Sequence, residues 1–96
     1  MRKYEIMYIV RPTLSEEELA ATVKKFNDLL NVDGSKVVNV TEMGQRELAY
    51  EIKKFRSGYY YVVDVEASND KAIKEFDRLA LISADIIRHL ITNKED

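Results

Sequence analysis

The side chains in this sequence that could take part in catalysis or metal binding are few and widely spaced. His89 is the single histidine and cysteine is absent, so one chain holds neither a histidine pair nor a thiolate site. Glu16, Glu17 and Glu18 are consecutive, so on a helix they point about 100° apart, and acidic residues are favoured at a helix start in any case. The three glycines lie too far apart to form a glycine-rich phosphate loop. We therefore expect no catalytic centre, no metal site and no cofactor.

Basic side chains favour binding over catalysis. Lys53, Lys54 and Arg56 fall within four residues. A single hairpin lysine is normally just solvated, but three charges this close indicate that one end of the molecule is positive. Further basic residues stand at strand starts, after a glycine and near the C-terminus: Arg2, Lys3, Arg46, Arg88 and His89.

The first half of the chain predicts a strand followed by a helix. Apolar residues alternate over 4–10, and Pro12 then ends the strand because it has no amide hydrogen to donate. Ser15 and Glu18 have the spacing of a capping box. We expect a helix of about four turns that ends near Gly34, where a left-handed cap costs least. Its apolar positions recur at helical spacing: Leu19, Val23, Phe26, Leu29 and Leu30.

The second half repeats this order after a longer strand. Alternation on both sides of Gly44 predicts one long strand over 36–53 with a kink or bulge at the glycine. The remaining expected elements are a hairpin connection over 53–58, a strand over 59–67, a helix capped by residues 68–70 and a strand over 86–91.

The resulting βαββαβ order predicts an α+β fold of the ferredoxin-like kind. In this fold two strand–helix–strand halves form a four-stranded antiparallel sheet with both helices on one face. We expect a single domain over 1–92 and a frayed tail over 93–96. The helix-free face must be soluble or covered by a partner.

Alternation along 59–67 decides which tyrosines face the helices. Tyr59 and Tyr61 belong to an unbroken apolar set, whereas Tyr60 shares its face with Asp64 and Glu66. The open face therefore lacks the paired aromatics with which an RNA-recognition motif stacks bases. It instead resembles a small protein-docking patch made of Met7, Ile9, Tyr60 and Val62.

Composition narrows the class of protein. The chain has 96 residues, 46% hydrophobic and 33% charged, as is typical of one globular domain. Its net charge of −2 excludes nucleic-acid binding by bulk positive charge. The absence of cysteine, of an apolar run near 20 residues and of a signal-peptide pattern predicts a cytoplasmic protein without membrane contact.

Residues 44–53, Gly-Gln-Arg-Glu-Leu-Ala-Tyr-Glu-Ile-Lys, resemble the signature of the bacterial small-subunit ribosomal protein six family. Residues 1–5, 58–60 and 86–89 resemble the same family, so the likeness runs from residue 1 to about residue 91. The resemblance implies a ferredoxin-like, non-enzymatic protein of the ribosome. It also implies binding to 16S ribosomal RNA on the platform of the small subunit, as a heterodimer with ribosomal protein eighteen.

The resemblance also implies where RNA is bound. A basic partner would supply the positive charge that this chain lacks, and an apolar sheet face would receive that partner. We expect the free protein to be a monomer. The RNA-binding candidates carried over by position are Arg2, Arg46, Lys54, Arg56 and Arg88.

Two other classes of protein share this fold. A regulatory or ligand-binding module would dimerise through its open sheet face, where Asp64 and Glu66 would repel their copies. An acylphosphatase-like hydrolase would need an arginine in a phosphate-binding loop after the first strand. Arg11 has that position, but Pro12 follows it where such a loop needs glycine.

Overall fold

The computed structural model describes residues 2–32 and 34–94. Two helices and four strands alternate in the expected βαββαβ order, which confirms the ferredoxin-like α+β prediction. In chain order the elements are β1 (Arg2–Val10), α1 (Glu16–Leu30), β2 (Ser35–Ile52), β3 (Phe55–Ala67), α2 (Lys71–Ile82) and β4 (Ile86–Asn93).

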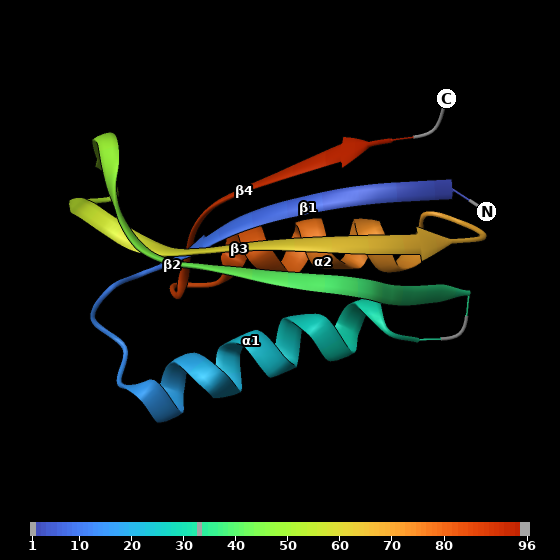
Figure 1. Cartoon of the computed structure of the whole chain (residues 1–96), viewed down its shortest axis with the longest axis horizontal. Coiled ribbons are helices and arrows are strands. Elements are labelled where there is room, and N and C mark those ends of the chain that lie inside the picture. Colours follow the sequence, from blue (N-terminus) through green and yellow to red (C-terminus); the bar gives the residue numbers. More distant parts are fainter. Residues whose placement is uncertain (1, 33, 95–96) are drawn as a thin grey trace.

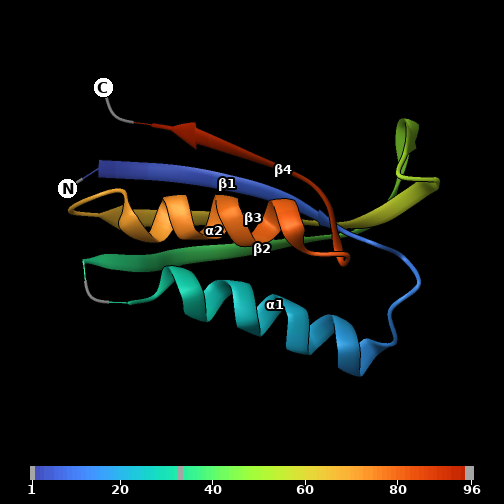
Figure 2. The ribbon, with the colours of Figure 1, turned by 180° about the vertical axis from the view of Figure 1, so that it is seen from behind.

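The four strands form one antiparallel sheet in the order β2-β3-β1-β4. Both helices cover the same face of this sheet, and the other face carries no helix (Figures 1 and 2). β1 begins and β4 ends at one end of the sheet, whereas the hairpin that joins β2 to β3 projects from the opposite end (Figure 1). The sheet therefore has a terminal end and a hairpin end.

Aromatic rings fill the space between the sheet and the helices. Tyr8 lies at the centre, with its ring stacked on Tyr61 at 5.4 Å between centroids and tilted against Phe76 at 5.7 Å and Phe26 at 6.3 Å. All four side chains are buried, as the alternation along β1 and β3 predicts. Burial raises the pKa of the Tyr8 phenol because the ionised form would lose its hydration.

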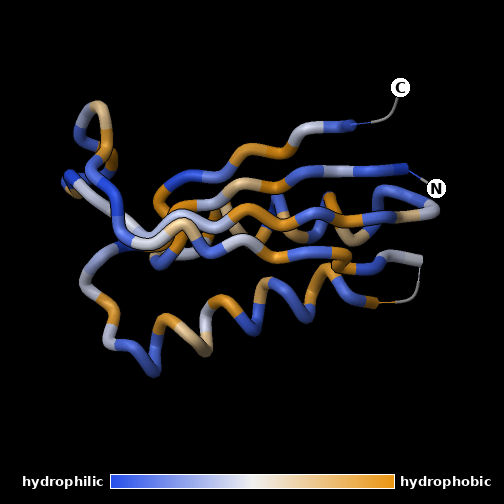
Figure 3. The backbone as a smooth tube through the Cα atoms, viewed as in Figure 1, coloured by the Kyte–Doolittle hydropathy of each residue, from blue (hydrophilic) through white to orange (hydrophobic). Residues whose placement is uncertain are grey.

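The expected capping box begins α1. The Ser15 hydroxyl accepts from the Glu18 amide at 3.2 Å, and the Glu18 carboxylate accepts from the Ser15 amide at 3.1 Å. These hydrogen bonds hold the pKa of Glu18 below its usual value because they favour the charged form. Orange and blue alternate along the α1 tube in Figure 3, as amphipathic spacing requires.

The predicted end of α1 is wrong, whereas a residue of the predicted 68–70 cap does bind the start of α2. α1 ends at Leu30 with Asn31 as its C-cap, and Gly34 instead lies in the turn before β2 with a φ of +87°. The reason is tertiary, since the Gly34 carbonyl accepts from the Ser68 amide at 2.8 Å. The side chain of Asp70 does not cap α2; the Asn69 side chain accepts from the Lys71 amide at 3.0 Å.

The strands differ from the prediction mainly at their ends. β2 is one long strand with a register shift and a positive φ at Gly44, which confirms the predicted bulge. Asn93, predicted to lie in a frayed tail, belongs to β4, and the Lys94 amide donates to the Lys3 carbonyl at 2.7 Å. Residues 95–96 of that tail lie outside the described residues. Across 2–32 and 34–94, no helix combines the length and apolar character needed to span a membrane.

Candidate nucleic-acid interface and partner face

The tip of the β2–β3 hairpin is a two-residue turn made of two lysines. Lys53 and Lys54 both have a positive φ, 49° and 71°, which is the backbone of the tightest hairpin turns. Ile52 pairs with Phe55 directly behind them. The connection is therefore shorter than the predicted 53–58, and Arg56 already lies within β3. Both lysines and Arg56 are exposed, so this end of the molecule presents three positive charges to solvent.

Behind the tip, the two strands of the hairpin lie out of register. Glu47 pairs with Ser57 and Ile52 pairs with Phe55, so the four residues between Glu47 and Ile52 face Arg56 alone. Such a mismatch forces the longer strand to arch away from its partner. The arch leaves a cleft of about 480 Å³ lined by Glu47, Leu48, Ala49, Tyr50, Glu51, Arg56 and Ser57.

Two further basic residues lie at this hairpin end. The Arg46 guanidinium donates to the Met43 carbonyl at 3.3 Å, beside the bulge at Gly44. Arg88 lies on β4 opposite Ile9 of β1, and its guanidinium donates to the Tyr50 hydroxyl. The hairpin therefore bends back across the open face far enough to contact the opposite edge of the sheet.

The five RNA candidates divide into two groups. Arg46, Lys54, Arg56 and Arg88 gather at the hairpin end. Arg2 pairs with Ala67 at the far end of β1 and does not join them.

The four residues expected to form the partner face lie together on the open side of the sheet. Met7 lies opposite Val62, and Ile9 lies opposite Tyr60. Met7, Tyr60 and Val62 are partly exposed as expected, but Ile9 is only 2% exposed. The hairpin shields part of this region. Met7, Ile9 and Tyr60 line a cleft of about 140 Å³ together with Leu48, Ala49, Tyr50, Ile52 and Arg88.

Glycine also allows Ile9 to pack so deeply. A Cβ atom added to Gly58 would lie 2.4 Å from the Ile9 Cγ2 atom, closer than real carbon atoms approach. Gly58 is buried and its φ is not in the left-handed region, so space rather than backbone freedom requires glycine here.

The terminal half of the open face carries charged side chains of both signs. Glu5 and Asp64 lie directly opposite each other on β1 and β3, an arrangement in which like charges repel. The Lys94 ammonium joins them, at 2.8 Å from Glu5 and 3.6 Å from Asp64. The hydrogen bond to Glu5 raises the pKa of Lys94. An apolar patch and a charged patch thus share one sheet face.

His89 has a structural role. It pairs with Tyr8 across β1 and β4, and therefore lies on the helix-covered face that the sequence left undecided. Its side chain is 12% exposed, its Nε2 atom is 2.6 Å from an Asp77 carboxylate oxygen, and its ring meets Phe76 edge-on. These contacts join β4 to α2 on the helix-covered face, whereas Arg88 lies on the open face.

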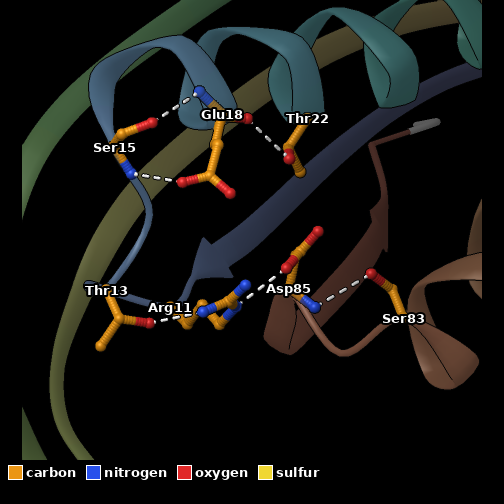
Figure 4. Close-up of polar contacts among 7 residues, drawn as sticks. All are labelled: Arg11, Thr13, Ser15, Glu18, Thr22, Ser83 and Asp85. Atoms are coloured by element: carbon orange, nitrogen blue, oxygen red, sulfur yellow. Dashed lines mark hydrogen bonds and ion pairs between the residues drawn. The ribbon is translucent and has the colours of Figure 1, made fainter.

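Arg11 also has a structural explanation. Its guanidinium donates to Asp85 at 2.8 Å and to the Thr13 hydroxyl at 2.6 Å, and its amide donates to the Asp85 carbonyl (Figure 4). These contacts tie the loop after β1 to the start of β4. Its donors are thus engaged within the protein rather than turned toward a phosphate. In the described part of the chain, no three histidine or acidic side chains are grouped as metal ligands would be.

Sequence reasoning did not identify Tyr50 or the cleft beside it. Tyr50 was part of the apolar alternation of the second strand, yet its side chain is 61% exposed. No local signal could have found it, because Leu48, Tyr50 and Ile52 alternate with small and charged residues as in a half-buried strand.

Known proteins resemble this chain over nearly its whole length. The family model for Ribosomal protein S6 matches residues 3–93. A crystal structure of 30S ribosomal protein S6 from Thermotoga maritima has a TM-score of 0.89 and 31% sequence identity, over 97% of this chain and 87% of that one. A protein from Arabidopsis thaliana, 12% identical over 100% of this chain and 95% of its own, has a TM-score of 0.57 and shares the fold alone.

Proposed function

The chain belongs to the ribosomal protein S6 family, and as a small-subunit ribosomal protein it acts, we propose, by binding 16S ribosomal RNA jointly with ribosomal protein eighteen. The hairpin end of the sheet contacts the RNA, and the open face receives the protein partner. Its role is structural rather than enzymatic, and its place is the ribosome in the cytoplasm.

The observation that carries this proposal is the gathering of five positive side chains, Lys53 among them, at one end of a chain whose net charge is −2. Lys54 and Arg56 belong to the hairpin, Arg46 stands at its base and Arg88 reaches it from β4. Contacts of such residues with phosphates position a protein on RNA without reading its sequence. Arg2 lies at the terminal end, so it would need a separate RNA segment or the partner-bound assembly to reach phosphate.

The open face supports a protein partner. Met7, Tyr60 and Val62 leave apolar surface exposed on the side without helices, and surfaces of this kind mark interaction sites. Asp64 and Glu66 share this face and would repel their copies in a symmetric dimer, which favours a different partner over a second copy of this chain. We expect the protein alone to be a monomer for that reason.

A gel-shift titration tests the joint binding. At physiological salt, the protein alone should bind a 16S ribosomal RNA fragment weakly, because few basic contacts release few counterions. Addition of ribosomal protein eighteen should make binding tight, and sedimentation should show one copy of each protein. Tight binding that does not depend on the partner would contradict the proposal.

The salt dependence of binding tests the hairpin. If Lys54 and Arg56 each meet a phosphate, replacing both with alanine should flatten the slope of log affinity against log salt by roughly 1.4–1.8 for the complex of both proteins with RNA. The matched control replaces Lys24 and Lys25, two exposed lysines of α1, and should leave the slope unchanged. A folded Lys54→Ala/Arg56→Ala variant with an unchanged slope would show that these hairpin charges are only solvated.

A further inference from the structure

The cleft behind the hairpin tip holds a set of side chains that phosphate binding does not explain. Tyr50, which is 61% exposed, lines it together with Glu47 and Glu51, while Arg56, a candidate for phosphate contact, lies on the facing strand. The two carboxylates would repel a phosphate entering the cleft. A neutral planar group with hydrogen-bond donors fits this lining better.

From this lining we infer that the cleft receives one unpaired nucleobase of the ribosomal RNA, stacked on the Tyr50 ring. The inference rests on the proposed function, since it specifies what the hairpin end does once RNA is bound. Unpaired bases are recognised in this way, by stacking on aromatic side chains and by hydrogen bonds along their pairing edges. A cleft of about 480 Å³ has the size of a small-ligand site.

The Tyr50 ring is held in place for stacking. Its hydroxyl accepts a hydrogen bond from the Arg88 guanidinium, which anchors the end of the side chain to β4 at the opposite edge of the sheet. The bulge between Glu47 and Ile52 arches the backbone that carries the ring. An exposed aromatic ring fixed at its hydroxyl loses little conformational freedom when a base stacks on it.

The carboxylates specify the base. Glu47 and Glu51 offer hydrogen-bond acceptors only, and the pairing edge of guanine presents two adjacent donors, its N1–H and its exocyclic amino group. Adenine presents one donor group on that edge beside an acceptor nitrogen. The cleft should therefore prefer an unpaired guanine, while Lys53 and Lys54 at the tip hold the phosphates on either side of it.

Substitutions of Tyr50 test the stacking in the complex with ribosomal protein eighteen and a 16S ribosomal RNA fragment. Tyr50→Leu should weaken RNA binding about 5- to 150-fold without changing the salt slope, because a stacked base carries no phosphate charge. Tyr50→Phe keeps the ring and should stay within about threefold of the parent. Both variants should fold, because Tyr50 is exposed, and their melting temperatures would be measured to check this.

Kethoxal, which modifies the N1 and N2 atoms of unpaired guanine, tests the base. In the parent complex one unpaired guanine should be protected, and at saturating protein it should become reactive with Tyr50→Leu and with Glu47→Gln/Glu51→Gln. If no guanine changes reactivity, the base assignment is wrong.

The remaining outcomes separate this inference from the proposed function. If the parent protein and its partner bind no RNA, the proposed function itself fails. If they bind and Tyr50→Leu binds equally well, the nucleobase site is overturned while the proposed function stands. If Tyr50→Leu weakens binding to ribosomal protein eighteen in the absence of RNA, Tyr50 belongs to the protein interface and the inference is overturned.

Discussion

Two adjacent tyrosines of β3 should respond in opposite ways to truncation. Tyr61 lies on the helix-covered face, is 6% exposed and stacks on Tyr8 with an interplanar angle of 19°. Tyr60 lies on the open face beside the β1 residue Ile9 and is only partly buried. Tyr61→Ala should therefore damage the fold, whereas Tyr60→Ala should damage binding of ribosomal protein eighteen.

The magnitudes follow from burial. Removing a buried aromatic ring costs about 3–5 kcal/mol, and a chain of this length has a total stability of about 5–14 kcal/mol. Tyr61→Ala should thus remove about a fifth or more of the stability and lower the urea midpoint by at least about 1 M. Tyr60→Ala should cost about 1 kcal/mol of stability and weaken partner binding by roughly 5- to 30-fold, since it truncates an aromatic residue of the docking patch.

Urea denaturation and calorimetric titration with the partner measure the two effects. Tyr61→Phe is the matched control for Tyr61→Ala, because it keeps the ring that stacks on Tyr8 and should stay close to the parent in both assays. If Tyr60→Ala proved the more destabilising of the two alanine variants, β3 would be shifted by one residue, which exchanges its two faces. That result would refute the assignment of the open face.

Three further substitutions test local features of the fold. Ser15→Ala should destabilise the protein by about 0.5–2 kcal/mol, as thermal melts would show. The cap lowers the pKa of Glu18 in the folded protein, so the loss caused by Ser15→Ala should be fully present above about pH 5. The loss should shrink as the pH falls below about 4, because Glu18 then becomes protonated. A loss that grew toward acid pH would contradict this assignment. Gly44→Ala should cost about 1–2 kcal/mol from its φ of +78° alone, since no atom lies within 4 Å of the added methyl group. Gly58→Ala should instead force Ile9 to shift, at a cost of about 1–3 kcal/mol, so equal urea midpoints for the parent and this variant would show that the packing there is loose.

Patterns local in sequence were sufficient for most of the fold. The alternation along 4–10 and 59–67 placed Tyr8 and Tyr61 in the core, because a strand with one buried face leaves its register no freedom. The spacing of Ser15 and Glu18 located the start of α1 for an equally local reason. The end of α1 was less well predicted, since Gly34 is held by Ser68, a residue that the sequence separates from it by more than 30 positions.

Contacts between distant segments explain what the sequence could not reveal. Both faces of the last strand mix apolar and polar residues, so only the packing of His89 against Asp77 and Phe76 decides its orientation. The sequence also did not predict a two-residue turn at the two lysines, because hairpin turns of this type normally carry asparagine or glycine. Lys53 and Lys54 adopt the required positive φ without either.

The candidate site shows most clearly which features follow from local sequence and which depend on contacts between distant segments. Its charges could be identified one by one along the chain, but their grouping depends on a hairpin that arches where Glu47 and Ile52 lose register with β3. That arch buries Ile9, exposes Tyr50 and brings Tyr50 into contact with Arg88, 38 residues further along the chain. One local mismatch thus removes a residue from the expected partner face and adds an aromatic ring to the expected RNA surface. The bulge, and not only the number of basic residues, therefore shapes the surface that the proposed RNA binding would use.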